Sequence, residues 1–147
     1  MFKHILVPTD GSNLSHTAAQ NAVEIAKATG AHITAFHVAP AYKFDLHDDH
    51  VPHGYMLPVD YEEQMARAAQ HHLDDVKKLA LGAGVECDGQ YALSDYPAAA
   101  IVRAVEKYGC DAIVMGSHGR TGINKLILGS ETQKVLVSTK VPVVVTH

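Results

Sequence analysis

Short apolar runs alternate along the chain with longer stretches of helical periodicity, and this alternation limits the fold more than any other feature. The first run, HILVP, begins at His4 and is followed by the turn residues TDGS. A short, continuous apolar run of this kind is typical of a strand buried on both faces of a parallel sheet. We expect five strands, in the segments HILVP, HITAFHVAP, VECDGQYAL, DAIVMG and VPVVVTH.

The stretches between these runs have apolar residues three or four positions apart, as in amphipathic helices. In the second stretch, for example, Leu73 and Val76 lie on the apolar face. Gly30 is the expected end of the first helix, and Asp95 is the expected N-cap of the third. The last helix is expected to begin at Gly129-Ser130.

Strands that alternate with helices predict an α/β protein of the Rossmann-like class, an open sandwich with helices on both faces of a five-stranded parallel sheet. Right-handed crossovers with one reversal of direction lead to the strand order 3-2-1-4-5. In such sheets ligands bind where the strand order reverses, here beside the first and fourth strands. The segments PTDGS (residues 8–12) and MGSHG (residues 115–119) follow those two strands and are expected to border that crevice.

The composition is ordinary for a globular protein, with 47% apolar and 19% charged residues. The net charge of -4 provides no basic field to attract nucleic acid or an anionic membrane. No segment has the pattern of a signal peptide or the length of a membrane span. Cys87 and Cys110 match no metal or disulfide pattern. We therefore expect one cytoplasmic domain, residues 1–147, with reduced cysteines and with neither nucleic acid nor a membrane as partner.

The segment MGSHGRTGINKLILGSETQ (residues 115–133) combines four glycines with hydroxyl side chains and the cations Arg120 and Lys125. Glycines allow positive φ and a close approach of backbone to ligand, and successive exposed N–H groups can bind an anion. A helix that starts at Gly129-Ser130 adds unpaired N–H donors and the positive end of the helix dipole. These residues favour a phosphate ligand. The alternative is that the glycines only turn the chain and that Ser130 is an ordinary N-cap.

Two common phosphate motifs are excluded. The chain contains no G-x-x-x-x-G-K-[ST] string, so it is not a P-loop NTPase. The Gly116–Gly119 segment lacks the G-x-G-x-x-G pattern and follows the fourth strand, which weakens a dinucleotide-binding interpretation.

The spacing of the glycines resembles G-2x-G-9x-G-[S/T], the nucleotide motif of the universal stress protein family. Two residues separate Gly116 from Gly119, and nine more precede Gly129-Ser130. The segments HILVPTDGS, CDAIVMGSHGRTG, LILGS and VPVVV also resemble that family, and the similarity extends over essentially the whole chain. It implies a five-stranded parallel sheet and membership of the branch that binds ATP, because every fixed position of the motif is present.

The resemblance also implies roles for individual residues. Asp10 would approach the ribose or a Mg²⁺ ion, and Val38 would lie against adenine and offer it backbone hydrogen bonds. Met115 would lie near the base or ribose, His118 and Arg120 would border the phosphates, and the motif glycines and serine would line the triphosphate. The implied ligand is ATP, ADP or AMP, with Mg²⁺ bound through the nucleotide and no separate metal site. The expected nucleotide-binding residues are Pro8, Thr9, Asp10, Val38, Met115, Gly116, His118, Gly119, Arg120, Gly129, Ser130, Glu131 and Thr132.

Asp10 and Val38 also have a purely structural alternative: Asp10 as a turn or capping residue and Val38 as a core residue. For the whole protein we expect an ATP-binding regulatory role in a stress response, because no residue stands out to position a water for hydrolysis and no G-x-S-x-G pattern occurs. A weak ATPase or nucleotide-dependent enzyme is one alternative. A protein that docks to an unknown partner and keeps a vestigial nucleotide site is another.

His47, His50 and His53 lie in the polar segment FDLHDDHVPHGY, with Asp48 and Asp49 between them. Such groups can hold zinc or nickel. The segment is more typical of a solvated, flexible loop of polar residues, and we expect no metal there.

The last expected strand, Val141–Thr146, is an apolar edge that contains Pro142. Proline is tolerated at an edge, and an exposed apolar edge is usually covered. Pairing of two copies about a two-fold axis would cover it, and the family resemblance implies the same homodimer. A helix or loop that covers the edge of a monomer is the alternative.

Overall fold

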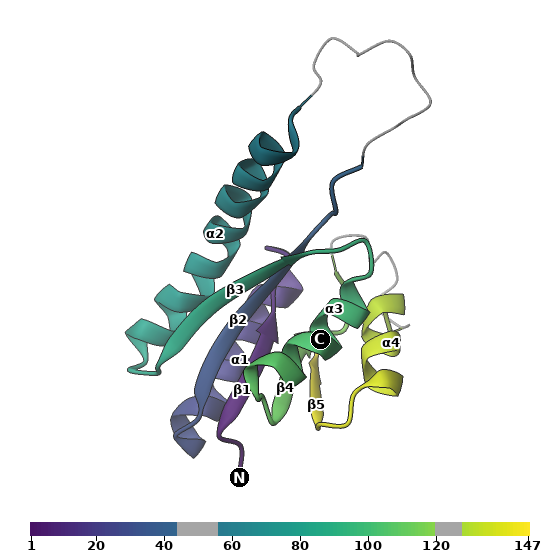
Figure 1. Cartoon of the computed structure of the whole chain (residues 1–147). Coiled ribbons are helices and arrows are strands. Elements are labelled where there is room, and N and C mark those ends of the chain that lie inside the picture. The colour runs from purple at the N-terminus through teal and green to yellow at the C-terminus, as the bar shows by residue number, and fades with distance from the viewer. Residues whose placement is uncertain (44–55, 120–127) are drawn as a thin grey trace.

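The computed structural model describes residues 1–43, 56–119 and 128–147. Strands and helices alternate through these residues, as Figure 1 shows. In chain order the elements are β1 (His4–Pro8), α1 (Asn13–Thr29), β2 (His32–Ala39), α2 (Pro58–Gly82), β3 (Cys87–Leu93), α3 (Pro97–Tyr108), β4 (Ala112–Gly116), α4 (Ser130–Ser138) and β5 (Val143–Thr146).

The five strands form one parallel sheet in the order β3-β2-β1-β4-β5, so the predicted fold and strand order are confirmed. Strand β1 is central and pairs with β2 on one side and β4 on the other. The order reverses between these two neighbours, which makes the carboxyl ends of β1 and β4 the place where a ligand is expected.

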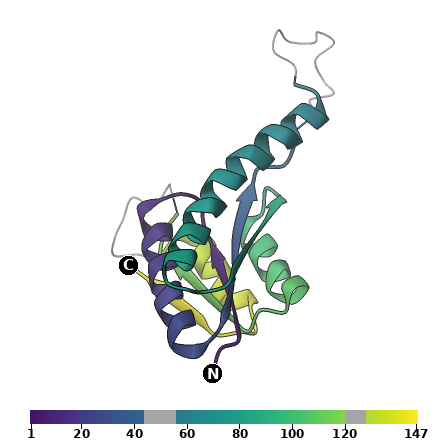
Figure 2. The ribbon, with the colours of Figure 1, turned by 90° about the vertical axis from the view of Figure 1, so that its left-hand side faces the viewer.

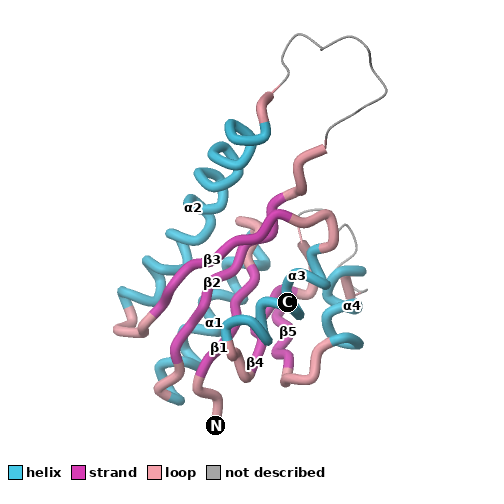
Figure 3. Tube along the Cα trace, viewed as in Figure 1, coloured by secondary structure: helices cyan, strands magenta, loops and turns pink. Residues whose placement is uncertain are grey.

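Helices cover both faces of the sheet, and alternate residues of the inner strands point to opposite faces. Ile5 and Val7 pack with residues of α1 and α2, whereas Leu6 packs with α3 and with Val135 of α4. Figures 1 and 2 show α1 and α2 on one side of the sheet and α3 and α4 on the other. The strands lie side by side between these two helical layers (Figure 3). Burial on both faces explains why β1 and β4 are apolar at consecutive positions.

Several element ends were predicted correctly because local backbone chemistry determines them. Gly30 ends α1 with a left-handed conformation at φ 72°, as its missing Cβ allows. Two strands start two residues later than predicted. The Val85 N–H bonds to Ala80 O at the end of α2, so β3 starts at Cys87. The last strand starts at Val143 instead of Val141.

The predicted N-cap of α3, Asp95, is wrong. Tyr96 is the N-cap and makes no side-chain cap bond. The Asp95 carboxylate instead accepts from the Ala41 N–H at 3.3 Å and lies 3.9 Å from Lys43 Nζ. Asp95 therefore holds the segment after β2, and α3 receives its cap from elsewhere.

Within the described residues, no helix is long and apolar enough to cross a membrane.

Candidate functional site

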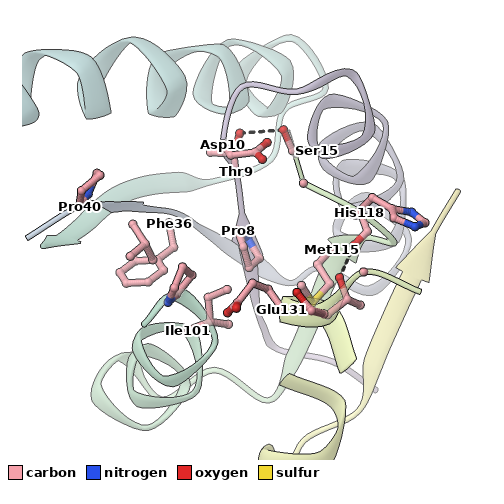
Figure 4. Close-up of a pocket in the computed structure, with 17 residues that line it drawn as sticks. Pro8, Thr9, Asp10, Ser15, Phe36, Pro40, Ile101, Met115, His118 and Glu131 are labelled. Atoms are coloured by element: carbon pink, nitrogen blue, oxygen red, sulfur yellow. Dashed lines mark hydrogen bonds between the residues drawn. The ribbon is translucent and has the colours of Figure 1, made fainter. Parts of the chain in front are cut away.

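A cavity of about 580 Å³ lies at the carboxyl ends of β1 and β4. Figure 4 shows its lining, in which Thr9 and Asp10 face Glu131 and Met115 across the opening. All the predicted site residues border this one cavity except Arg120, which lies outside the described residues. The lining residues are Pro8, Thr9, Asp10, Ser15, Phe36, Val38, Pro40, Pro97, Ile101, Met115, Gly116, His118, Gly119, Gly129, Ser130, Glu131 and Thr132.

The loop after β1 is held on both sides by hydrogen bonds. The Thr9 N–H donates to Phe36 O at 2.8 Å, and His37 Nδ1 lies 2.8 Å from Thr9 O. Asp10 Oδ1 accepts from the Ser12 N–H at 3.0 Å, which is the turn contact expected of an aspartate before glycine. Asp10 therefore acts as a turn residue, as the structural alternative predicts, and it also lines the cavity.

Helix α4 begins in the cavity wall. Gly129 is its N-cap, with φ -59° and ψ 149°, and the Gly129 N–H donates to Ser117 O at 2.8 Å. The alternative that Ser130 is an ordinary N-cap is therefore wrong. Because a glycine N-cap has no side chain and α4 has no side-chain cap bond, the N–H groups of its first turn stay open to a ligand. The positive end of the helix dipole lies there as well.

None of the three motif glycines has a positive φ, and each lies close to atoms of another segment. A Cβ on Gly129 would lie 3.0 Å from Ser117 O, and one on Gly116 would lie 3.2 Å from the backbone at the start of α1. A Cβ on Gly119 would lie 2.9 Å from Asp10 Oδ2. Glycine thus lets the loops from β1 and β4 and the start of α4 meet around the cavity.

Val38 presents backbone groups to the cavity. In β2 the His32 N–H donates to Lys3 O and Phe36 O accepts from the Thr9 N–H, so even-numbered residues direct their polar groups toward β1. Strand β1 ends at Pro8, and its pairing with β2 ends at Phe36. The N–H and C=O of Val38, two residues further along, therefore point past the end of β1. Val38 is half-buried and lines the cavity, so it is more than a core residue.

Glu131 and Thr132 line the cavity, and their side chains make hydrogen bonds within the protein. The Thr132 hydroxyl is buried and donates to Gly116 O at 3.1 Å, which ties α4 to β4. The Glu131 carboxylate accepts from the Ala98 N–H of α3 at 3.0 Å. Both residues lie in the first turn of α4, so their N–H groups belong to its open end.

Met115 and His118 are buried beside the glycines. Met115 belongs to the apolar cluster beneath α3 and α4, and it lines the cavity. His118 Nδ1 lies 3.0 Å from Ser117 Oγ, which fixes the imidazole at the end of β4.

Residue patterns missed part of the lining: Ser15, Phe36, Pro40, Pro97 and Ile101. Ser15 belongs to α1, and its hydroxyl lies 3.3 Å from Thr9 Oγ1, a bond drawn in Figure 4. Pro97 and Ile101 come from the start of α3, which lies beside the end of β2 only in the folded chain. The helical spacing of Ile101 signalled burial, but it carried no information about a ligand.

The histidine segment with His47, His50 and His53 lies outside the described residues. Among residues 1–43, 56–119 and 128–147, no group of three or more His, Cys, Asp or Glu side chains could hold a metal ion. Asp10 and Glu131 are the carboxylates of the described lining: Glu131 is bonded to α3, and Asp10 accepts from the Ser12 N–H.

Comparison with known proteins identifies relatives of the whole chain. A model of the universal stress protein family matches residues 1–147. Universal stress protein MJ0531 of Methanocaldococcus jannaschii is 34% identical over 150 residues, which cover 99% of this chain and 82% of the relative. A universal stress protein of Thermus aquaticus is 34% identical over 144 residues, which cover 97% of each chain.

Solved structures share the fold. The structure of protein MJ0577 of Methanocaldococcus jannaschii superimposes with a TM-score of 0.82 at 25% identity and covers 99% of this chain and 96% of its own. A universal stress protein in complex with cAMP has a TM-score of 0.74 at 20% identity, with 99% and 97% covered. One from Archaeoglobus fulgidus in complex with dAMP has a TM-score of 0.61 at 20% identity, with 97% and 96% covered. With a family match over its full length and curated relatives at 34% identity, this chain belongs to the universal stress protein family.

Proposed function

We propose that this protein binds an adenine nucleotide in the cavity at the carboxyl ends of β1 and β4 and acts as a nucleotide-responsive regulator in a stress response. One observation carries the proposal: a single cavity joins the uncapped start of α4 to an apolar end that Val38 borders with unpaired backbone groups. An uncapped helix start suits phosphate, and an apolar slot with a backbone donor and acceptor suits a purine.

At the phosphate end, the N–H groups of Ser130, Glu131 and Thr132 would donate to phosphate oxygens. The Ser130 side chain is exposed at the helix start, where its hydroxyl would add a further donor. Asp10 would contact the ribose or a Mg²⁺ ion that enters with the nucleotide. A metal held mainly by phosphate oxygens and water needs only one or two protein carboxylates.

At the base end, Phe36, Pro97 and Ile101 would pack against the faces of the purine. The Val38 N–H and C=O would pair with its edge, as a neighbouring strand would. Met115 would lie beneath the base or ribose. Family members of this fold have been solved with cAMP and with dAMP, which supports an adenine ligand in general and leaves ATP, ADP and AMP to be ranked by titration.

A regulatory role is favoured over an enzyme because the described lining has no group held ready to activate water. The Asp10 and Glu131 carboxylates both accept hydrogen bonds from backbone N–H groups, and the imidazole of His118 is paired with Ser117. We expect at most slow ATP hydrolysis. Single-turnover hydrolysis well above the protein-free rate would favour the weak ATPase instead.

We propose further that one cytoplasmic domain of residues 1–147 forms a homodimer through Val141–Thr146, and that a protein partner reads the nucleotide state. The Pro142 carbonyl, just before β5, accepts from Ile113 of β4, and the Thr146 carbonyl accepts from Ser117, just after β4. The backbone groups of Val143 and Val145 therefore point to the open side. A second copy of β5 would pair with these groups.

The first test is calorimetric titration of nucleotide-stripped protein with Mg-ATP, ADP and AMP, beside the double variant Gly129→Val, Ser130→Ala. The valine side chain would meet Ser117 O and the His118 backbone, and would push the start of α4 away from the ligand. We expect micromolar binding by the wild type and a loss of about tenfold or more in the variant, since charge-assisted bonds are removed.

Gly82→Ala is the matched control, because a Cβ there meets nothing within 4 Å and Gly82 ends α2 without a positive φ. It should bind as the wild type does. If the wild type binds no nucleotide, the proposal fails and the vestigial-site alternative gains support. Equal affinity in the wild type and the double variant would place the phosphates elsewhere.

A further inference from the structure

The Glu131 side chain crosses from one helix to another at the rim of the cavity. Glu131 is the second residue of α4, and its Oε2 accepts from the Ala98 N–H at the start of α3, at 3.0 Å. Its Oε1 accepts from Lys134 Nζ of the next turn of α4 at 2.9 Å. Glu131 also borders a second cavity, of about 550 Å³, which lies between α3 and α4. The carboxylate is thus held between the two helices.

Helix α3 needs a cap from outside its own sequence. Tyr96 occupies the N-cap position without a side-chain cap bond, and Pro97 has no N–H. The Ala98 N–H is therefore the first donor of the helix, and it is part-buried. The Glu131 carboxylate satisfies this donor and places a negative charge at the positive end of the α3 dipole.

The two helices joined in this way both line the main cavity. Pro97 and Ile101 of α3 belong to the part proposed for the base, and Gly129 and Ser130 at the start of α4 belong to the part proposed for the phosphates. The separation of these two parts determines whether one ligand can contact both. A carboxylate bonded to α3 is also kept away from the N–H groups that a phosphate would use.

We propose that Glu131 is a positioning residue, which sets the spacing between the base end and the phosphate end of the cavity by joining the start of α4 to the start of α3. This inference rests on the proposed nucleotide function. Glu131 contributes through its backbone to the phosphate end, and through its carboxylate to the geometry of the whole site.

The ionisation of Glu131 agrees with this geometry. The hydrogen bond from Lys134 lowers the pKa of the Glu131 carboxyl most, and the Ala98 N–H lowers it further against the opposing effect of partial burial. The carboxylate is therefore charged at neutral pH and can serve as the acceptor for α3.

The test compares Glu131→Ala with Glu131→Gln. Glutamine keeps an oxygen that can accept from Ala98, whereas alanine removes it. We expect Glu131→Ala to weaken Mg-ATP binding about fivefold to tenfold, as the loss of a charge-assisted hydrogen bond would. Glu131→Gln should bind Mg-ATP within about twofold of the wild type. Adenosine, which occupies only the base end, should bind both variants within about twofold of the wild type in an NMR titration.

Glu106→Ala and Glu106→Gln are the matched controls, because Glu106 is an exposed carboxylate near the other end of α3. They should bind Mg-ATP as the wild type does, and thermal melts should verify that every variant is folded. Unchanged Mg-ATP affinity in Glu131→Ala would overturn the proposal. So would equal changes in Glu131→Ala and Glu131→Gln, which would indicate a simple effect of charge near the phosphates.

Hydrogen exchange at the Ala98 amide separates this inference from the proposed function. If the wild type binds no nucleotide, the proposed function fails and so does any role of Glu131 in affinity. If the wild type binds, the Ala98 amide should exchange about tenfold faster in Glu131→Ala and at nearly the wild-type rate in Glu131→Gln. Unchanged exchange in Glu131→Ala would show that Ala98 does not depend on this carboxylate, and would overturn the positioning role.

Discussion

At Gly129 the absence of a side chain matters more than backbone freedom. Its φ of -59° is accessible to any residue, yet a Cβ would lie 3.0 Å from Ser117 O and 3.3 Å from His118 Cα. The same holds for Gly116, whose Cβ would meet the backbone of Leu14. Each of these glycines allows two backbone segments to approach closely, and the segments they bring together form the wall of the cavity.

A second contact at the residue scale holds the loop after β1. Because Thr9 O can only accept, His37 Nδ1 carries the hydrogen in the 2.8 Å bond between them. The His37 ring also packs against His72 of α2, with ring centroids 4.8 Å apart. His37 therefore positions Thr9 and Asp10 from the neighbouring strand, although it does not line the cavity itself.

We expect His37→Ala to lower the free energy of unfolding by about 1 kcal/mol and to weaken nucleotide binding about fivefold, because the loop loses this bond. His37→Asn should restore much of the affinity, since its amide can donate to the same carbonyl. Calorimetric titration of both variants, with urea unfolding curves beside it, checks the prediction. Equal losses in the two variants would show that ring packing matters and that the hydrogen bond does not.

At the scale of elements, helix and strand ends are joined by side chains from distant parts of the chain. Asp111, just before β4, accepts from the Lys3 N–H at 2.9 Å and from the His4 N–H at 3.0 Å. It thereby fixes where β1 begins relative to β4. Although burial would raise the pKa of the Asp111 carboxyl, these backbone N–H groups lower it below its ordinary value of 3.8.

We expect Asp111→Asn to reduce the free energy of unfolding at pH 7 by about 1 kcal/mol, because part of a charge-assisted interaction is lost at a partly exposed site. A lowered pKa in the folded state stabilises the fold above pH 3.8, and this contribution disappears as the pH falls through the lowered value. The difference between wild type and variant should therefore shrink on acidification.

Urea unfolding of both proteins at pH 7 and at several values between about pH 5 and pH 2.5 measures this difference. Asp75→Asn is the matched control, because Asp75 is exposed on α2. A difference between wild type and Asp111→Asn that stays constant over this range would contradict the assigned role of the carboxylate.

At the scale of the whole molecule, β5 leaves one edge of the sheet available for pairing. The odd-numbered residues Val143 and Val145 direct their backbone groups away from β4, while Val144 lies in the β4 ladder. The substitution Val145→Pro would remove an N–H that points to the open side of β5, and it would remove no hydrogen bond to β4.

We expect the wild type to have a mass near twice 15.8 kDa in light scattering, and Val145→Pro to approach the mass of one chain. Val145→Thr, which keeps the N–H, is the control and should stay dimeric. Nucleotide affinity should be similar in all three proteins because the cavity is built within one chain. A wild type that has the mass of one chain at micromolar concentration would reject the dimer.

Much of the cavity lining was predictable because the glycine intervals are local and match the family motif. Gly116, Gly119 and Gly129-Ser130 could be recognised by that resemblance, and the strand order then brought them beside Asp10. Pro97 and Ile101 could not be recognised, because they reach the cavity only through the packing of α3 against the sheet.

The sequence by itself determined the elements and their order, since hydrophobic periodicity and turn residues act over a few positions of the chain. Only the tertiary structure decided which hydrogen-bond donors and acceptors pair with one another. Asp95 is adjacent to α3, yet the cap comes from Glu131, because after folding its carboxylate is the acceptor that lies 3.0 Å from Ala98. The N–H and C=O of Val38 likewise have no partner strand in the described part of the chain, because β1 ends at Pro8, opposite Phe36, two residues before Val38. A hydrogen bond depends on distance and direction in space, and the spacing of residues along the chain does not contain that information.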